Sequence, residues 1–196
     1  MNDISGFILA AFALVGSPGP ATLSLAATGA AFGARRGLGY LVGIEVGMIM
    51  IMVITASGVM GVLLAVPRAT PIVTGLGAGY ILYLAYRIAT KQAKADDSKP
   101  ERHPSFWAGL FLSLVNPKAY ASLAALYSGF VLVKDSFVED AVLKGIVLLV
   151  ILTAVDVAWL VSGSALSKRV QDPTINRAVN VTFAVLLVVS VAFAVL

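Results

Sequence analysis

Three ionisable side chains lie inside long apolar segments of the sequence: Glu45, Lys118 and Asp156. Each costs about 2.5–3.5 kcal/mol at the centre of a membrane helix, so such residues usually mark a binding site or a proton pathway. Lys118 is suited to a substrate carboxylate or an acidic partner, and the two acids to a proton or a substrate ammonium. Two alternatives stay open: Lys118 forms a structural ion pair with one acid, and Glu45 sits at the membrane interface.

Two groups of helix-breaking residues lie near the middle of apolar segments. Pro18-Gly19-Pro20 is in the first segment, and Asn116-Pro117 is in the fourth, directly before Lys118. Proline removes a backbone donor and clashes with the preceding turn, so both segments are predicted to break there. Amides freed at the start of a half-helix suit a carboxylate, and paired breaks predict a shared central site. The alternative is a pair of packing kinks.

The composition predicts which elements position these residues. Apolar residues make up 59% of the 196 residues and charged residues only 12%, which excludes a soluble globular domain. The sequence predicts an all-α integral membrane protein with six transmembrane helices, because each long apolar run is long enough to span a bilayer. The approximate bounds of these helices are 4–32, 38–65, 71–89, 105–132, 141–166 and 178–196.

The polar stretch 91–104 is predicted to be a cytoplasmic linker between two three-helix halves, residues 1–90 and 105–196. Ten lysines and arginines occupy one set of alternate loops, whereas the opposite set holds three, Arg68, Lys134 and Lys144. Because positive charge favours the cytoplasmic side, the first set is predicted to lie in the cytoplasm and both termini outside.

Each half has an odd number of helices, so the second half must enter the membrane with the opposite topology, as in an inverted repeat. A short match between the halves supports this interpretation. Residues 21–27 and 119–125 agree at five of seven positions, and each copy directly follows a helix break. The sequence therefore predicts a 3+3 inverted repeat whose first and fourth helices are broken at mid-membrane.

Aromatic and glycine patterns add secondary candidates. Tyr80 and Tyr83 lie on one stripe of the third segment, where they are candidates to line a cavity, with a membrane-interface belt as the alternative. Gly39, Gly43 and Gly47 form a small-residue ridge that allows another helix to approach closely. That ridge serves packing inside one protomer or between two, so a homodimer is a possible assembly.

The absent residue types exclude several classes of protein. The chain has no cysteine and one histidine, His103, which lies in the charged linker. Disulfides and Cys/His metal sites therefore have no residues to form them, so we expect no metal. We also expect no cofactor and no nucleic-acid partner. An intramembrane enzyme is disfavoured because no histidine base lies in a membrane segment and the acids lack the Gly-x-Gly-Asp context of an aspartyl protease.

Taken in order, these motifs resemble the lysine exporter family of bacterial amino acid translocators, the LysE/RhtB type. The resemblance covers nearly the whole chain, although Ala85 replaces an expected glycine. It rests on Pro18-Gly19-Pro20, Gly29, Gly33, Arg35, Gly37, Gly43, the run from Gly77 to Leu84, Phe106, Gly109 and Asn116-Pro117-Lys118-Ala119.

The resemblance implies a multi-pass protein of the bacterial plasma membrane that exports amino acids or close derivatives, driven by the proton gradient. The residues themselves suggest a site for a zwitterion, with Lys118 and the broken-helix amides on the carboxylate and Asp156 or Glu45 on the ammonium. The expected partners are the amino acid, protons and the lipid bilayer. The competing interpretation is an uncoupled channel or pore for small solutes, which the same features would serve.

Overall fold

A computed structural model describes residues 4–58, 69–90, 104–169 and 173–195. The predicted all-helical class is confirmed for these ranges, which contain helices and no strands. The predicted linker 91–104 lies outside the described residues except for Pro104. The helices are α1 (Ile4–Gly16), α2 (Pro20–Phe32), α3 (Ala34–Ala56), α5 (Ala69–Ala89), α6 (Phe106–Leu114), α7 (Pro117–Gly129), α8 (Phe137–Arg169) and α9 (Pro173–Val195).

Both predicted helix breaks are present. The first apolar segment consists of α1 and α2, which meet at a bend of 58°, and the fourth consists of α6 and α7. Pro20 and Pro117 occupy the first position of α2 and α7, where the missing amide hydrogen costs no helical hydrogen bond. Asn116 caps α7 by accepting a hydrogen bond from the amide of Lys118.

Length and hydropathy single out some of these helices as membrane spans. Among the described residues, α3 and the 137–166 portion of α8 are long and apolar enough to cross a membrane, and the bent pair α1–α2 is a third span if counted as one. The predicted total of six spans goes beyond this result. The same is true of the inverted repeat.

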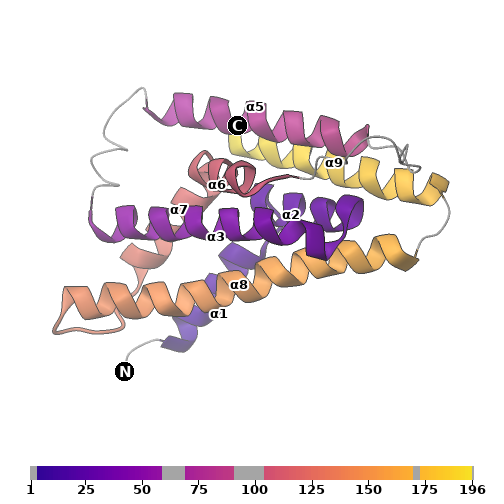
Figure 1. The fold of residues 1–196 in the computed structure, drawn as a ribbon. Helices are drawn as coiled ribbons and strands as arrows, with labels where there is room; N and C mark the ends of the chain where they lie inside the picture. The colour runs from indigo at the N-terminus through magenta and orange to yellow at the C-terminus, as the bar shows by residue number, and fades with distance from the viewer. Residues whose placement is uncertain (1–3, 59–68, 91–103, 170–172, 196) are drawn as a thin grey trace.

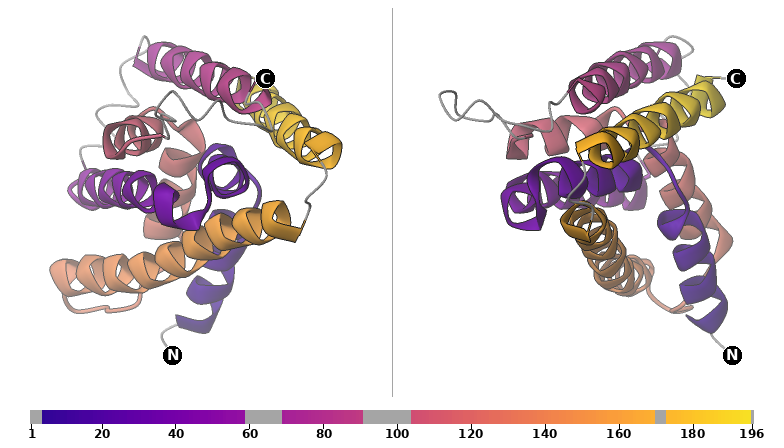
Figure 2. Two further views of the ribbon diagram at one scale, coloured as in Figure 1. Left: turned by 45° about the vertical axis from the view of Figure 1, so that its right-hand side comes forward. Right: turned by 90° about the vertical axis from the view of Figure 1, so that its right-hand side faces the viewer.

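The helices pack around a central region that the broken helices cross. In Figures 1 and 2, α5 and α9 lie side by side along one face of the molecule and α8 runs along the opposite face. Between them, α2 packs against α8 and α3 packs against α6. α1 leaves this layer beside α7, and both halves of the first broken helix, α1 and α2, contact α8.

Glycines allow the two closest helix pairs to approach. A Cβ on Gly43 of α3 would overlap the carbonyl oxygen of Phe106 on α6, and a Cβ on Gly163 of α8 would overlap the carbonyl oxygen of Ala26 on α2. The predicted glycine ridge of α3 therefore packs within the protomer at Gly43. It does not do so along its whole length, because a Cβ on Gly39 would meet only open space.

Gly43→Ala is expected to destabilise the protein by about 1–3 kcal/mol, the usual range for overpacking a tight contact. The added methyl group would force α3 away from the backbone of α6. The measurement is the midpoint of thermal unfolding in detergent. Gly39→Ala is the matched control on the same ridge, and it should leave the midpoint unchanged or slightly raised. Equal midpoints for the two variants would contradict the assigned contact.

A buried ion pair fixes the segment between α7 and α8. Asp140 contacts Lys144 through Oδ2 and Nζ at 2.6 Å, and its Oδ1 accepts hydrogen bonds from the amides of Leu132 and Val133. Lys144 also donates to the carbonyl oxygen of Tyr127 at 3.0 Å. The prediction that Lys144 is a loop charge is wrong, because the residue lies inside α8 and is only 2% exposed.

Asp140→Asn is expected to lower stability by about 2–3 kcal/mol, because it leaves the Lys144 ammonium buried without a counter-charge. The check is again the thermal midpoint in detergent. Glu139→Gln removes the same charge from the neighbouring exposed position and serves as the control. A midpoint for Asp140→Asn equal to that of Glu139→Gln would show that the pair contributes nothing.

Candidate functional site

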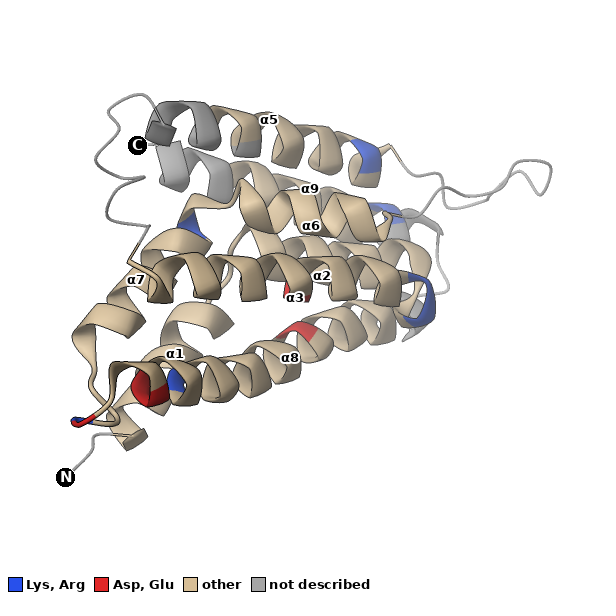
Figure 3. Ribbon diagram, turned by 60° about the vertical axis from the view of Figure 1, so that its left-hand side comes forward, with Lys and Arg blue, Asp and Glu red and all other residues tan. Residues whose placement is uncertain are grey.

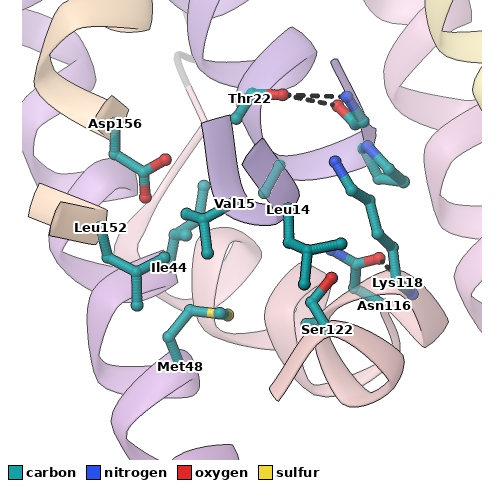
Figure 4. Close-up of a pocket in the computed structure, with 14 residues that line it drawn as sticks. Leu14, Val15, Thr22, Ile44, Met48, Asn116, Lys118, Ser122, Leu152 and Asp156 are labelled. Atoms are coloured by element: carbon teal, nitrogen blue, oxygen red, sulfur yellow. Dashed lines mark hydrogen bonds between the residues drawn. The ribbon is translucent and has the colours of Figure 1, made fainter. Parts of the chain in front are cut away.

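A pocket lies where the two helix breaks meet. α1, α2, α3, α7 and α8 all contribute to it, and Figure 4 shows Lys118 and Asp156 on opposite sides. Most of the lining is apolar, with a few polar groups between. The lining residues are Leu14, Val15, Gly19, Pro20, Ala21, Thr22, Ile44, Met48, Asn116, Lys118, Ala119, Ser122, Leu152 and Asp156. Of the predicted site residues, the structure thus brings Gly19, Pro20, Asn116, Lys118 and Asp156 to one pocket.

Lys118 connects the second break to the first. Its ammonium donates to the carbonyl oxygen of Ser17 at 2.7 Å, to Oγ of Ser17 at 2.8 Å and to the carbonyl oxygen of Pro18 at 3.4 Å. The suggested acidic partner is therefore wrong, since these acceptors are neutral oxygens at the end of α1. In this conformation Lys118 therefore forms an ion pair with neither Glu45 nor Asp156. Pro18 and Pro117 flank this contact but do not line the pocket.

The two membrane-segment acids are buried together. Asp156 is 2% exposed and lines the pocket, whereas Glu45 is 8% exposed and lies just outside the lining. Glu45 lies on α3 and Asp156 on α8, and these two helices pack against each other. Both carboxylate oxygens of Glu45 and Oδ2 of Asp156 are buried without a hydrogen-bond partner among the described residues. A buried carboxylate in this state is costly unless a proton or a cation joins it.

The chain itself uses some of the amides freed at the breaks. Oγ1 of Thr22 accepts a hydrogen bond from the amide of Gly19 at 2.9 Å, and Oδ1 of Asn116 accepts from the amide of Lys118 at 3.2 Å. These two amides are therefore not open to a substrate carboxylate in this conformation. The ammonium of Lys118 is left as the cationic group on that side of the pocket.

Tyr80 and Tyr83 do not line the central pocket. They line a separate one with Arg87, Pro104 and Ser105, at the end of α5 next to the start of α6. The ring of Tyr80 packs edge-on against Phe111, with centroids 5.2 Å apart, and the guanidinium of Arg87 lies 6.0 Å from the ring centre of Tyr83. Tyr80 and Tyr83 therefore lie away from the helix breaks.

Sequence reasoning missed several hydroxyl groups at the site. Ser17 accepts from Lys118, Thr22 caps the first break, and Ser122 lines the pocket from α7. Tyr40, which is fully buried on α3, donates to Oγ of Ser24 at 3.0 Å. The available signal was a small polar residue inside an apolar segment, close to a break. That signal is weak, because a serine or threonine hydroxyl inside a helix can also donate to a carbonyl oxygen of its own helix and need not mark a site.

Broken helices that meet at a pocket inside an apolar helical chain are typical of membrane transporters. A family model described as LysE type translocator matches residues 12–196, and the chain belongs to this family. The resemblance seen in the sequence is thereby confirmed. Membership places the chain among translocators rather than enzymes, and together with the apolar helices it indicates a multi-pass protein of the bacterial inner membrane.

Similar proteins carry more specific names. A cysteine/O-acetylserine efflux protein of Escherichia coli K12 is 28% identical over 172 residues, which cover 88% of this chain and 87% of that protein. The protein of the same name from Salmonella typhimurium LT2 is 27% identical over 172 residues, with the same coverage. No solved structure matches the chain. Both relatives are named as efflux proteins for cysteine and O-acetylserine.

Proposed function

We propose that this protein exports amino acids or close derivatives from the cytoplasm by proton antiport and alternating access. The observation that carries the proposal is the pocket between the helix breaks, with the Lys118 ammonium on one side and the Asp156 carboxyl group on the other. An amino acid zwitterion carries both charges and needs a partner for each when it leaves water. A pocket with opposite charges on opposite walls meets that need.

The acids also supply a route for coupling. Asp156 and Glu45 lie on helices that pack against each other, and neither is paired with Lys118. Two adjacent carboxylates cannot both stay charged at low cost, so one of them binds a proton or a substrate ammonium. If proton and ammonium compete for the same acid, release of one accompanies binding of the other, which is the requirement for antiport.

The chain's charge distribution supports the proposed topology. Figure 3 shows lysine and arginine at the start of α3 and at the end of α5, at one end of the molecule, and acidic residues at the start of α8, at the other end. We place the basic end in the cytoplasm, both termini outside and the linker 91–104 in the cytoplasm. The halves 1–90 and 105–196 would then form the 3+3 inverted repeat, with six spans and mid-membrane breaks.

The relatives suggest the class of substrate. Their names state cysteine and O-acetylserine, which are small amino acids without a charged side chain. Apolar and hydroxyl side chains such as Val15, Met48 and Ser122 dominate the rest of the pocket lining. They suit a substrate with a small uncharged side chain. We therefore propose a small neutral amino acid as the substrate, and Pro18, Gly19, Pro20, Asn116 and Pro117 as the residues that shape its site. Tyr80 and Tyr83 would line the cytoplasmic approach.

The experiment that tests this function uses inverted membrane vesicles, in which export appears as uptake. The vesicles carry a proton gradient with the acidic side inside, and they are offered labelled cysteine, O-acetylserine, alanine or lysine. Vesicles that lack the protein are the control. Gradient-dependent uptake of one or more neutral amino acids is the expected result. Uptake that persists unchanged after a protonophore collapses the gradient would favour the uncoupled pore, and no uptake of any amino acid would overturn the proposal.

The topology has its own test. Alkaline phosphatase, which is active only outside the cytoplasm, is fused after residue 98 or at the C-terminus. The C-terminal fusion should be active and the linker fusion inactive. The reverse pattern would overturn the orientation.

A further inference from the structure

The half-helices α1 and α7 meet at two places, although they belong to different halves of the chain. Near the pocket, the ammonium of Lys118 holds the carbonyl and hydroxyl oxygens of Ser17. Farther away, the rings of Phe7 and Phe130 pack edge to face, with centroids 5.5 Å apart. We call this pair of contacts the α1–α7 joint. The two half-helices that it joins both contribute residues to the pocket lining.

The inner contact of the joint is shaped for a lysine. A Cβ on Gly19 would lie 2.8 Å from both Cδ and Nζ of Lys118, so the lysine chain lies directly against this glycine. The first break thus supplies both the space for the side chain and the oxygens that receive its ammonium. The contact links residues 101 positions apart and therefore couples the positions of the two breaks.

The partners of Lys118 leave its charge poorly compensated. Each of its three acceptors is a neutral oxygen, and a cation that is partly removed from water is stabilised better by a carboxylate. A carboxylate that enters the pocket would therefore compete with Ser17 for the ammonium.

We propose that the substrate carboxylate displaces Ser17 from Lys118, so that substrate binding releases α1 from α7. This inference rests on the proposed function. It adds that the substrate must have a carboxylate and that α1 moves relative to α7. Ser17 is then a positioning residue that holds Lys118 when the pocket is empty. Only solutes with a free carboxylate open the joint, and amines or amides of the same size do not.

The movement is tested by joining the two half-helices. The chain has no cysteine, so Phe7→Cys/Phe130→Cys introduces the only two thiols. A short thiol-reactive cross-linker that a reducing agent cleaves is applied in vesicles. Cross-linking is expected to reduce transport to background, and reduction to restore it. Each single-cysteine variant is the control, and the cross-linker should leave its transport at the level measured before treatment.

The substrate requirement is read from the rate of cross-linking. A transported amino acid should slow the reaction of the double-cysteine variant, because it separates α1 from α7. The amide of the same amino acid, which lacks the carboxylate, should leave the rate unchanged. Equal effects of the two compounds would overturn the role assigned to the carboxylate.

Ser17→Ala tests the role of Ser17 through KM, which would not fall if Ser17 were only a structural residue. Removing one acceptor frees Lys118, so the substrate has less to displace and KM should fall about threefold, the factor expected for one hydrogen bond of ordinary strength. Ser17→Thr keeps the hydroxyl and should restore the original KM. A KM that rises or stays constant in Ser17→Ala would overturn the proposal.

The outcomes separate this inference from the proposed function. If the reduced double-cysteine protein and the unmodified protein both fail to transport, the proposed function is wrong and the joint falls with it. If cross-linked protein transports normally, the proposed opening of the joint is wrong and the proposed function stands.

Discussion

Asp156→Asn is expected to abolish gradient-driven export while leaving the amount of protein in the membrane unchanged. Asparagine has nearly the same shape as aspartate, so the packing of this 2% exposed side chain survives. What is lost is the ability to take up and release a proton or to pair with a substrate ammonium. Losing a buried charge pair costs about 2–5 kcal/mol, which corresponds to a decrease in transport efficiency of roughly 30- to 4,000-fold.

Two assays distinguish the roles of Asp156. In gradient-driven uptake the variant should fail, whereas in exchange of labelled for unlabelled substrate without a gradient it should work if Asp156 carries only the proton. Failure in both assays would assign Asp156 to the ammonium. Asp135→Asn removes an exposed acid from the segment before α8 and is the matched control. Normal gradient-driven uptake by Asp156→Asn would show that this residue has no part in transport.

Lys118→Gln is expected to produce the second large loss. It removes the cation from the pocket wall and the hydrogen bonds to Ser17 that close the α1–α7 joint. Glutamine is shorter and uncharged, so the substrate carboxylate loses its charged partner. We expect KM to rise by roughly 30-fold or more, because a hydrogen bond between charged groups in a partly buried site contributes about 2–5 kcal/mol.

Two other lysines serve as controls for this measurement. Lys134→Gln removes an exposed charge and should leave transport and stability unchanged. Lys144→Gln breaks the ion pair with Asp140, so it should lower the thermal midpoint without a selective effect on KM. If Lys118→Gln lowers the midpoint as Lys144→Gln does and leaves KM unchanged, Lys118 is a structural residue only.

The sequence was sufficient for features that depend on local chemistry. Pro20 and Pro117 end a helix wherever it packs, because each lacks an amide hydrogen, and the structure has both breaks. The cost of burying Glu45 and Asp156 is likewise a property of the side chains, which made them candidates before any neighbour was known. The order of glycines and prolines along the chain also sufficed to identify the translocator family, which the family model confirms.

The contacts between distant segments depended on the tertiary structure. Lys118 has several rotatable bonds and can reach acceptors in many directions, so only the packing of α1 against α7 selects Ser17 over Asp156. Tyr80 and Tyr83 face a different pocket because the orientation of α5 is fixed by its contact with α9. Residue spacing gives the face of a helix but not the neighbour that the face meets.

Glycines of the same pattern show this limit most directly. Gly39 and Gly43 are one turn apart on α3 and equivalent in sequence, yet only Gly43 lies against the backbone of α6. The sequence by itself therefore determined an apolar helical transporter chain with two breaks and buried charges. The tertiary structure decided which groups meet across the pocket, because a long-range contact requires the relative positions of whole helices and no local propensity contains them.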